Sequence, residues 1–270
     1  MKRPELQYYE LADGVTAFST TRHGGMSQGN YSEMNINPFC GDDEVLIEMN
    51  LSLLAKELDV DEMHIFLPQQ CHETNCFWIE ESFMNLPRVT QHRQLAGVDA
   101  VVTRLTDVCI GVSTADCIPI LLFDTRLRIG AVVHAGWRGT QKRIVKKVIS
   151  GMTIEFGTVA TDVVAQIGPG ISLKNFEVGD EVYDAFADAG FDMERISRRM
   201  PSPGSNGDGS EKWHIDLPLC NELQLLEAGL RSDSIHKSEI CTYDHADDYF
   251  SARRLGMDCG RIYTGLVIRR

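Results

Sequence analysis

The sequence predicts an α+β fold whose core is a mixed β-sheet. Between Val98 and Ile167, the 270-residue chain contains five strand-like runs: VDAVVT, VCIGVS, IPILLF, IGAVVH and VVAQIG. Only the last two runs are separated by a helix-like segment, TQKRIVKKVISGM. Several strands in a row with helices interspersed favour a mixed sheet over a regular βαβ repeat. The length suits one large domain, here residues 1–270, although two small domains would also fit.

Four segments have helical character. Residues 43–60 combine apolar positions with acidic residues near the start, which favours an amphipathic helix. Within 140–152, the apolar positions Ile144, Val145, Val148 and Ile149 have the spacing of one helical face. Further helices are expected at 179–189 and 218–229. Residues 201–210, PSPGSNGDGS, are rich in turn formers and predict an exposed, mobile loop.

Composition excludes several classes of partner. The formal net charge of −13 argues against binding to nucleic acid or to an anionic membrane surface, while a small phosphate could still be held by local arginines. No run of eighteen apolar residues occurs, and no apolar stretch follows the basic residues near the N-terminus, so neither a membrane span nor a secretory signal is expected. Without an export signal, the eight cysteines are expected to be reduced thiols in the cytoplasm. They contain no CxxC pair, so neither a zinc ribbon nor a thioredoxin-type redox site is indicated. The sequence does not predict an oligomeric state.

The segment TADCIPILLFDTRLRIGAVVHAGWRG predicts an antiparallel hairpin. Two apolar runs flank the polar segment 124–128, and folding the chain about Thr125–Arg126 places Cys117 opposite His134. Directly opposed residues share a face, with Cβ atoms roughly 4.5–5.5 Å apart. A zinc ion can be held across such a pair. A cysteine at the edge of a core strand can equally be a small hydrophobic residue, and a lone histidine at a strand end is a weak signal.

A third metal ligand is expected from another part of the chain. His72, in LPQQCHETNC, follows a short strand-like run and lies in a polar turn. Three protein ligands with a fourth position left for water are typical of catalytic rather than structural zinc. Such a metal lowers the pKa of bound water and supplies a nucleophile or proton acceptor.

The segment Ala135–Thr140 joins the end of a strand to the start of a helix. Its small residues allow backbone N–H groups to face a ligand, and Arg138 adds a planar cation suited to phosphate or carboxylate. A tight turn with a surface arginine explains the same residues. Asp116 could orient a ligand or act as a base, or it could be an exposed carboxylate at a strand end.

Motifs along nearly the whole chain, from about residue 15 to 265, resemble one known family. STTRHGGMSQGNY, MNIN, GDD, QQCH, VDAVVT, TADCIPIL, VVHAGWRGT, IGPGIS, FEVG, CTY and FSARR…GR occur in the order of the YfiH-type family. That family is similar to zinc-dependent purine nucleoside phosphorylases and was formerly described as multicopper polyphenol oxidases. The family's usual QVHG is QCHE here, and its SYRR is SARR.

This resemblance implies a single domain with an α/β/β/α layered arrangement and a His–Cys–His metal site at His72, Cys117 and His134. It also implies phosphorolysis of adenosine, inosine and methylthioadenosine, together with adenosine deamination, and some members are linked to editing of peptidoglycan precursors. We therefore predict a zinc-dependent purine nucleoside phosphorylase, with nucleoside and phosphate as its small-molecule partners. Arg138, Arg22 and Arg253 are the expected contacts to phosphate or ribose.

Three alternatives stay open at the level of sequence. A copper-dependent polyphenol oxidase would need many imidazoles in HxH pairs, and this chain has eight histidines and no HxH, although copper itself also suits a His/Cys site. A cysteine hydrolase would use Cys117 as nucleophile and His134 as base. A non-catalytic metal-binding or partner-binding protein would merely retain the fold.

Overall fold

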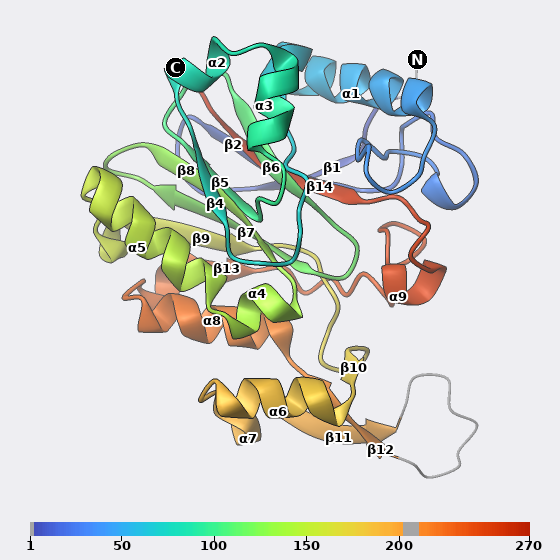
Figure 1. Ribbon diagram of the computed structural model, residues 1–270, viewed down its shortest axis with the longest axis vertical. Helices are drawn as coiled ribbons and strands as arrows, with labels where there is room; N and C mark the ends of the chain where they lie inside the picture. The colour runs from blue at the N-terminus through green and yellow to red at the C-terminus, as the bar shows by residue number, and fades with distance from the viewer. Residues whose placement is uncertain (1–2, 202–210) are drawn as a thin grey trace.

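Two β-sheets packed face to face form the centre of the protein, in a computed structural model that describes residues 3–201 and 211–270 (Figure 1). The first sheet has the strand order β1 (Leu6–Tyr9), β2 (Val15–Thr20), β14 (Ile262–Ile268), β6 (Cys109–Thr114) and β3 (Ile65–Phe66). The second has the order β13 (Ile235–Lys237), β9 (Val163–Ile167), β7 (Ile118–Asp124), β8 (Ile129–Ala135), β5 (Ala100–Thr103) and β4 (Cys76–Ile79). Both sheets mix parallel and antiparallel pairs, as predicted.

The central strands β7 and β8 are buried along their whole length. Successive side chains of a strand point to opposite faces, so each strand contributes to two apolar layers. Val132 packs between the two sheets, whereas Val133 packs toward the helices that cover the second sheet. Burial on both faces explains why these strands are continuous apolar runs rather than alternating ones.

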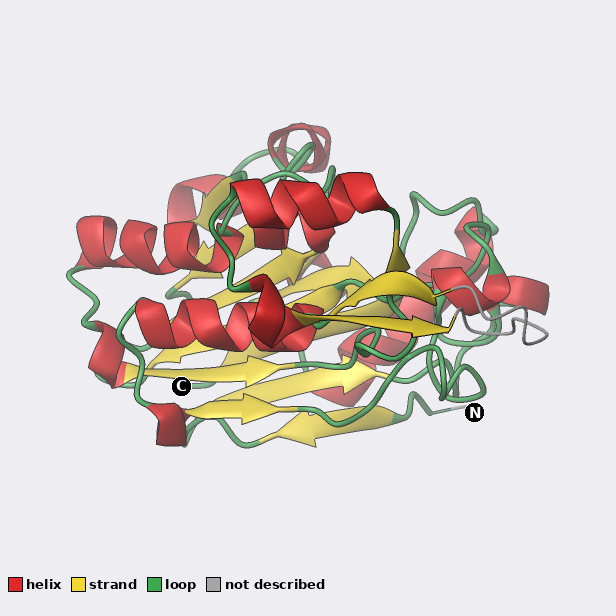
Figure 2. Ribbon diagram, turned by 90° about the horizontal axis from the view of Figure 1, so that it is seen from below, coloured by secondary structure: helices red, strands yellow, loops and turns green. Residues whose placement is uncertain are grey.

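Helices cover the outer face of each sheet, which completes the α/β/β/α layering (Figure 1). Helix α1 (Glu44–Leu58) begins where the Asp43 carboxylate accepts hydrogen bonds from two backbone N–H groups, and it packs on the first sheet. Helices α4 (Trp137–Gln141), α5 (Ile144–Phe156) and α8 (Leu217–Glu227) cover the second sheet. Figure 2 shows the strands of the larger sheets running across the view, with helices beside them. The α+β fold class is confirmed.

The remaining elements lie at the periphery. A third sheet was not predicted and has the order β10 (Glu177–Val178), β12 (Glu211–Ile215) and β11 (Ser197–Pro201), next to α6 (Asp180–Asp188) and α7 (Met193–Ile196). The described part also contains the short helices α2 (Glu81–Met84), α3 (Arg88–Gln94) and α9 (Ala252–Leu255) and the 3-10 helices η1 (Gly29–Tyr31), η2 (Glu62–His64), η3 (Ala160–Asp162) and η4 (Ser232–Ser234). The loop expected at 201–210 lies outside the described residues, apart from Pro201. Among the described residues, the helices are too short or too polar to cross a membrane.

The helix expected at 140–152 is wrong in one respect, because two helices meet there. Helix α4 begins at Trp137 rather than near Thr140, and α5 begins at Ile144. Between them, Arg143 adopts a left-handed conformation with φ of 61°. Its guanidinium donates a hydrogen bond to the Ala189 carbonyl at 3.1 Å, and a contact with α6's C-cap therefore stabilises the break.

Candidate functional site

The β7–β8 hairpin brings Cys117 and His134 to the same end of the second sheet, but its register differs from the predicted one. Pro119, not Cys117, lies opposite His134, which is a difference of two residues. The cause is Asp124, which pairs with Ile129 and whose carboxylate accepts hydrogen bonds from two turn N–H groups. A shift of two residues keeps a side chain on the same face, so Cys117 still lies diagonally from His134.

His72 reaches the same place from a turn that wraps around Asp99. The two carboxylate oxygens of Asp99 accept hydrogen bonds from the backbone N–H groups of His72 (2.9 Å) and Glu73 (2.8 Å). These contacts hold His72 at a φ of 62°, a conformation that is uncommon for residues other than glycine. Asp99 also accepts a hydrogen bond from Nδ1 of His134 at 2.8 Å. One fully buried carboxylate therefore positions both histidines.

Asp99 belongs to the candidate site and was not predicted from the sequence. It directly precedes β5, inside the VDAVVT motif, where it begins a run of buried apolar residues. A charged residue at the start of an otherwise apolar strand is a usable signal, because a buried charge needs a specific partner.

The side chains of His72, Cys117 and His134 form a group that could hold a metal ion. Their ligand atoms all lie within 4.8 Å of one another, and the two imidazole rings are nearly perpendicular with centroids 4.7 Å apart. Since Nδ1 of His134 donates to Asp99, its Nε2 is the nitrogen left for a metal. The donor set of two imidazoles and one thiolate suits zinc or copper and leaves a position for water or substrate.

The electrostatics of the site ionise Cys117 and leave His134 with a proton that a metal ion must displace. Burial acts to raise the pKa of Cys117, but the nearby imidazoles of His134 and His72 outweigh it and lower this pKa to about 6. Burial acts to lower the pKa of His134, yet the Cys117 thiolate and the Asp99 carboxylate raise it to about 9. For Asp99, burial is outweighed by the hydrogen bond and charge of His134, so its pKa falls well below the usual range. The thiol is therefore ionised at neutral pH, as a metal ligand must be.

Gly136 leaves the room that these side chains occupy. A Cβ atom at this position would lie 3.0 Å from Sγ of Cys117 and 3.1 Å from Cδ2 of His72. The backbone at Gly136 has φ of −66°, so its conformation alone does not require glycine. The absence of a side chain is required by the site itself.

The group opens into a cavity of about 170 Å³ at the ends of β6, β7 and β8. Its described lining combines the three side chains with the following residues: Asn37, Phe39, Cys40, Gln70, Ser113, Thr114, Ala115, Ala252, Met257 and Arg261. Arg261, which belongs to the GR of the FSARR…GR motif, was not selected from the sequence. Its guanidinium donates to the Met257 carbonyl at 2.9 Å and thereby holds the 257–261 segment at the cavity.

The three arginines expected at the site do not line this cavity in the described part of the chain. Arg22 donates to the carbonyls of Ser32 and Ala246. The Arg253 guanidinium donates to the carbonyl of Glu177. Arg138 is exposed in the first turn of α4, with its guanidinium 4.3 Å from the centre of the Trp137 ring.

Asp116 connects the site to the C-terminal part of the chain. One carboxylate oxygen accepts a hydrogen bond from the Thr242 hydroxyl and the other from the Arg253 backbone N–H, both at 2.7 Å. Its φ of 86° directs the chain from β6 toward Cys117. Asp116 therefore fixes the loop that carries the thiol.

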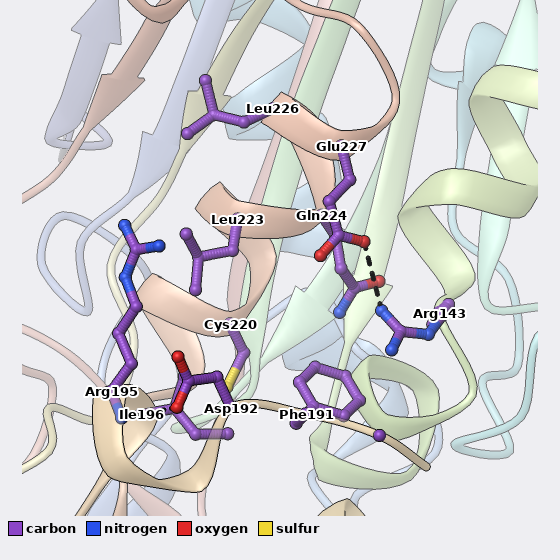
Figure 3. A pocket seen from close by; sticks show the side chains of 11 residues that line it. Arg143, Phe191, Asp192, Arg195, Ile196, Cys220, Leu223, Gln224, Leu226 and Glu227 are labelled. Carbon is purple, nitrogen blue, oxygen red and sulfur yellow. Dashed lines mark hydrogen bonds and ion pairs between the residues drawn. The ribbon is translucent and has the colours of Figure 1, made fainter.

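A larger cavity of about 400 Å³ lies elsewhere, between α7, α8 and the α4–α5 junction (Figure 3). Arg143, Phe191, Gln224 and Glu227 are among its lining residues, and Arg143 pairs with Glu227 across it. None of the three candidate ligands contributes to this cavity. The smaller cavity is therefore the candidate reaction site.

The chain is similar to known proteins over nearly its whole length. A family model described as multi-copper polyphenol oxidoreductase laccase matches residues 16–269. The chain is 43% identical to the purine nucleoside phosphorylase of Bacteroides thetaiotaomicron, over 95% of this chain and 92% of that protein. It is 41% identical to adenosine deaminase RL5 from an unknown prokaryotic organism, over 97% of each chain.

The fold has a close counterpart among solved structures. The crystal structure of the hypothetical protein YfiH from Bacillus licheniformis superimposes with a TM-score of 0.87 at 24% identity, covering 98% of this chain and 97% of that chain. The resemblance to YfiH-type proteins is confirmed. This chain therefore belongs to the multi-copper polyphenol oxidoreductase laccase family, and over nearly its whole length it is a relative of a purine nucleoside phosphorylase and an adenosine deaminase.

Proposed function

We propose that this protein is a metal-dependent purine nucleoside phosphorylase that also deaminates adenosine. Its substrates are adenosine, inosine and methylthioadenosine, which react with phosphate to give the free base and the corresponding ribose 1-phosphate. The observation that carries the proposal is the His72–Cys117–His134 group open to a cavity, in a chain 43% identical to a purine nucleoside phosphorylase and 41% identical to an adenosine deaminase.

We assign the three side chains as ligands of one zinc ion, with copper as the alternative ion for the same donors. A bound zinc supplies Lewis acidity and lowers the pKa of coordinated water, as deamination requires. The protein's own contribution is positional. Asp99 keeps the His134 proton on Nδ1 and holds the His72 backbone, so both imidazoles face the thiolate of Cys117.

Phosphate requires a cationic or N–H-rich partner near the cavity. We assign this role to Arg138, with Arg22 and Arg253 as further contacts to phosphate or ribose. Arg138 is exposed at the start of α4, and this helix begins directly after Gly136. Gly136 lies beside the thiol of Cys117, since a Cβ atom added to it would be 3.0 Å from Sγ. We place the enzyme in the cytoplasm, which is consistent with its eight free cysteines.

Two alternative activities can be tested on the same protein. Copper-dependent phenol oxidation is suggested by the description of the family model. Cysteine hydrolysis is suggested by the lowered pKa of Cys117 beside His134. A phenol substrate with copper-loaded protein tests the first, and acylation of the metal-free protein by a thiol-directed probe tests the second.

The experiment incubates protein of known metal content with a panel of purine nucleosides, with and without phosphate, and identifies the products by mass. We expect phosphate-dependent formation of base and ribose 1-phosphate, and phosphate-independent conversion of adenosine to inosine. His72→Ala should abolish both reactions, whereas His236→Ala, which removes an exposed histidine of β13, should leave them unchanged. Absence of both products from wild-type protein containing metal would refute the proposal.

A further inference from the structure

The hydroxyl of Thr114 is buried without a hydrogen-bond partner among the described residues. Thr114 is the last residue of β6, only 2% exposed, and it lines the cavity beside the candidate metal ligands. A buried hydroxyl that makes no hydrogen bond costs stability. Unlike Thr158, whose buried hydroxyl also lacks a partner among the described residues, Thr114 lines the cavity, where a bound ligand can supply the missing partner.

The strand pattern directs Thr114 toward the candidate metal site. Ile110 and Val112 pack in the layer between the two sheets, and Thr114 shares their face of β6 because side chains two residues apart point the same way. Val132 packs in the same layer from β8, so His134 also faces it. Thr114 and His134 thus lie at the same end of the inter-sheet layer, and both line the cavity.

The neighbouring Ser113 shows the opposite situation. Its backbone N–H donates to Oε1 of Gln70, and its carbonyl accepts from Nε2 of the same side chain, both at 2.8 Å. Its hydroxyl is bonded to the Asn37 amide. The polar groups of Ser113 are therefore occupied within the protein, and the hydroxyl of Thr114 is left for a ligand.

We propose that Oγ1 of Thr114 hydrogen-bonds a ribose hydroxyl of the bound nucleoside and so determines specificity for the sugar. The inference rests on the proposed function. A hydroxyl both donates and accepts, which matches the alcohols of ribose. A nucleoside lacking the contacted alcohol leaves Thr114 unpaired again, which is how a buried polar group discriminates against a deoxy analogue.

The test compares Thr114→Val with wild type on inosine and on its 2′-, 3′- and 5′-deoxy analogues. Valine removes the hydroxyl and adds a methyl of similar size. With inosine, kcat/KM should fall by about tenfold, within a range of roughly five- to a hundredfold. With one deoxy analogue the substitution should have no effect, because the contact is already absent. Thr114→Ser should keep the discrimination.

Thr158→Val is the matched control. Thr158 is 1% exposed, its hydroxyl also lacks a partner among the described residues, and it does not line the cavity. The kcat/KM of Thr158→Val for inosine should equal that of the wild type. Both valine variants should keep or raise Tm, because each removes an unpaired buried hydroxyl. A uniform loss on all four nucleosides, or a lower Tm for Thr114→Val alone, would overturn the inference. Wild-type protein that phosphorolyses no nucleoside would instead refute the proposed function, and the inference with it.

Discussion

The Oδ1 atom of Asp99 accepts hydrogen bonds both from Nδ1 of His134 and from the backbone N–H of His72. A single carboxylate, 0% exposed, therefore orients two candidate ligands that lie 62 residues apart in the sequence. The hydrogen-bond partner of a metal-binding imidazole sets the tautomer and the basicity of the ring, so a change at Asp99 should alter metal binding.

Asp99→Asn should weaken metal binding by about ten- to a hundredfold, because the neutral amide no longer stabilises the required tautomer of His134. Competition with a chelator measures the affinity. Asp233→Asn, which changes an exposed aspartate paired with Arg231, is the control and should have no effect. Equal affinity of Asp99→Asn and wild type would show that the hydrogen bond does not support ligation.

Protein purified without added copper should contain about one zinc per chain, since its three candidate ligands match a catalytic zinc set. His72→Ala, Cys117→Ala and His134→Ala should each remove the metal and leave a folded protein, because a 270-residue core does not depend on it. Elemental analysis and circular dichroism give the two readouts. Several coppers per chain would contradict the assignment, and unfolding of all three variants would indicate a structural site.

Gly136→Ala should lower metal affinity by about tenfold or more, because the added Cβ displaces ligands that must be held within about 0.5 Å of their positions. Gly151→Ala is the matched control, since its Cβ would lie equally close, 3.0 Å, to the Trp78 ring, with none of the candidate ligands within 4 Å. That variant should change Tm rather than metal affinity. The opposite pattern would show that Gly136 serves the backbone and not the site.

Metal binding should release protons from the Cys117–His134 pair in a pH-dependent number. With pKa values of about 6 for Cys117 and about 9 for His134, the metal-free pair carries one proton between these pH values and two below the lower one. A ligating pair carries none, so about one proton leaves in this window and about two below it. Affinity should therefore rise with pH up to the higher value and then level off.

Calorimetry in buffers of different ionisation enthalpy, at a pH midway between the two values, measures this proton release. Cys117→Ser removes the thiolate that raises the pKa of His134, so less of His134 is protonated before the metal binds. The variant should therefore release fewer protons, and it should also bind the metal more weakly. The number of protons released should be larger at a pH below the pKa of Cys117 than at a pH between the two pKa values. An equal number at both pH values would contradict the assignment of the pair.

Arg138→Ala should raise the phosphate requirement for phosphorolysis by roughly ten- to a hundredfold, which corresponds to a charge-assisted contact of about 1.5–3 kcal/mol. Arg138→Lys should rescue only partly, because lysine lacks the planar two-pronged geometry. Deamination needs no phosphate and should suffer far less. Phosphate titrations of ribose 1-phosphate release, with inosine formation followed in parallel, separate the outcomes. Equal loss of both reactions would assign Arg138 to nucleoside binding or to the fold, and an unchanged phosphate dependence would exclude it from the site.

The sequence by itself determined the strands, the helical faces and the grouping of Cys117 with His134. Strands β5 to β9 are short apolar runs bounded by turn residues. Strands that are buried on both faces need apolar side chains at nearly every position, so they can be recognised from the local sequence. The predicted register of the β7–β8 hairpin was wrong by two residues, but the predicted grouping of Cys117 with His134 was still correct. Side chains two residues apart in a strand point to the same face of the sheet.

Only the tertiary structure decided what surrounds those ligands. Asp99, Gly136 and Thr114 lie at the candidate site through contacts with segments distant in sequence or on the facing sheet, and no local spacing encodes such contacts. The break between α4 and α5 likewise depends on the contact of Arg143 with the C-cap of α6. Which arginine lies at the cavity was decided in the same way, because the packing of two sheets brings Arg261 there from the C-terminal end of the chain.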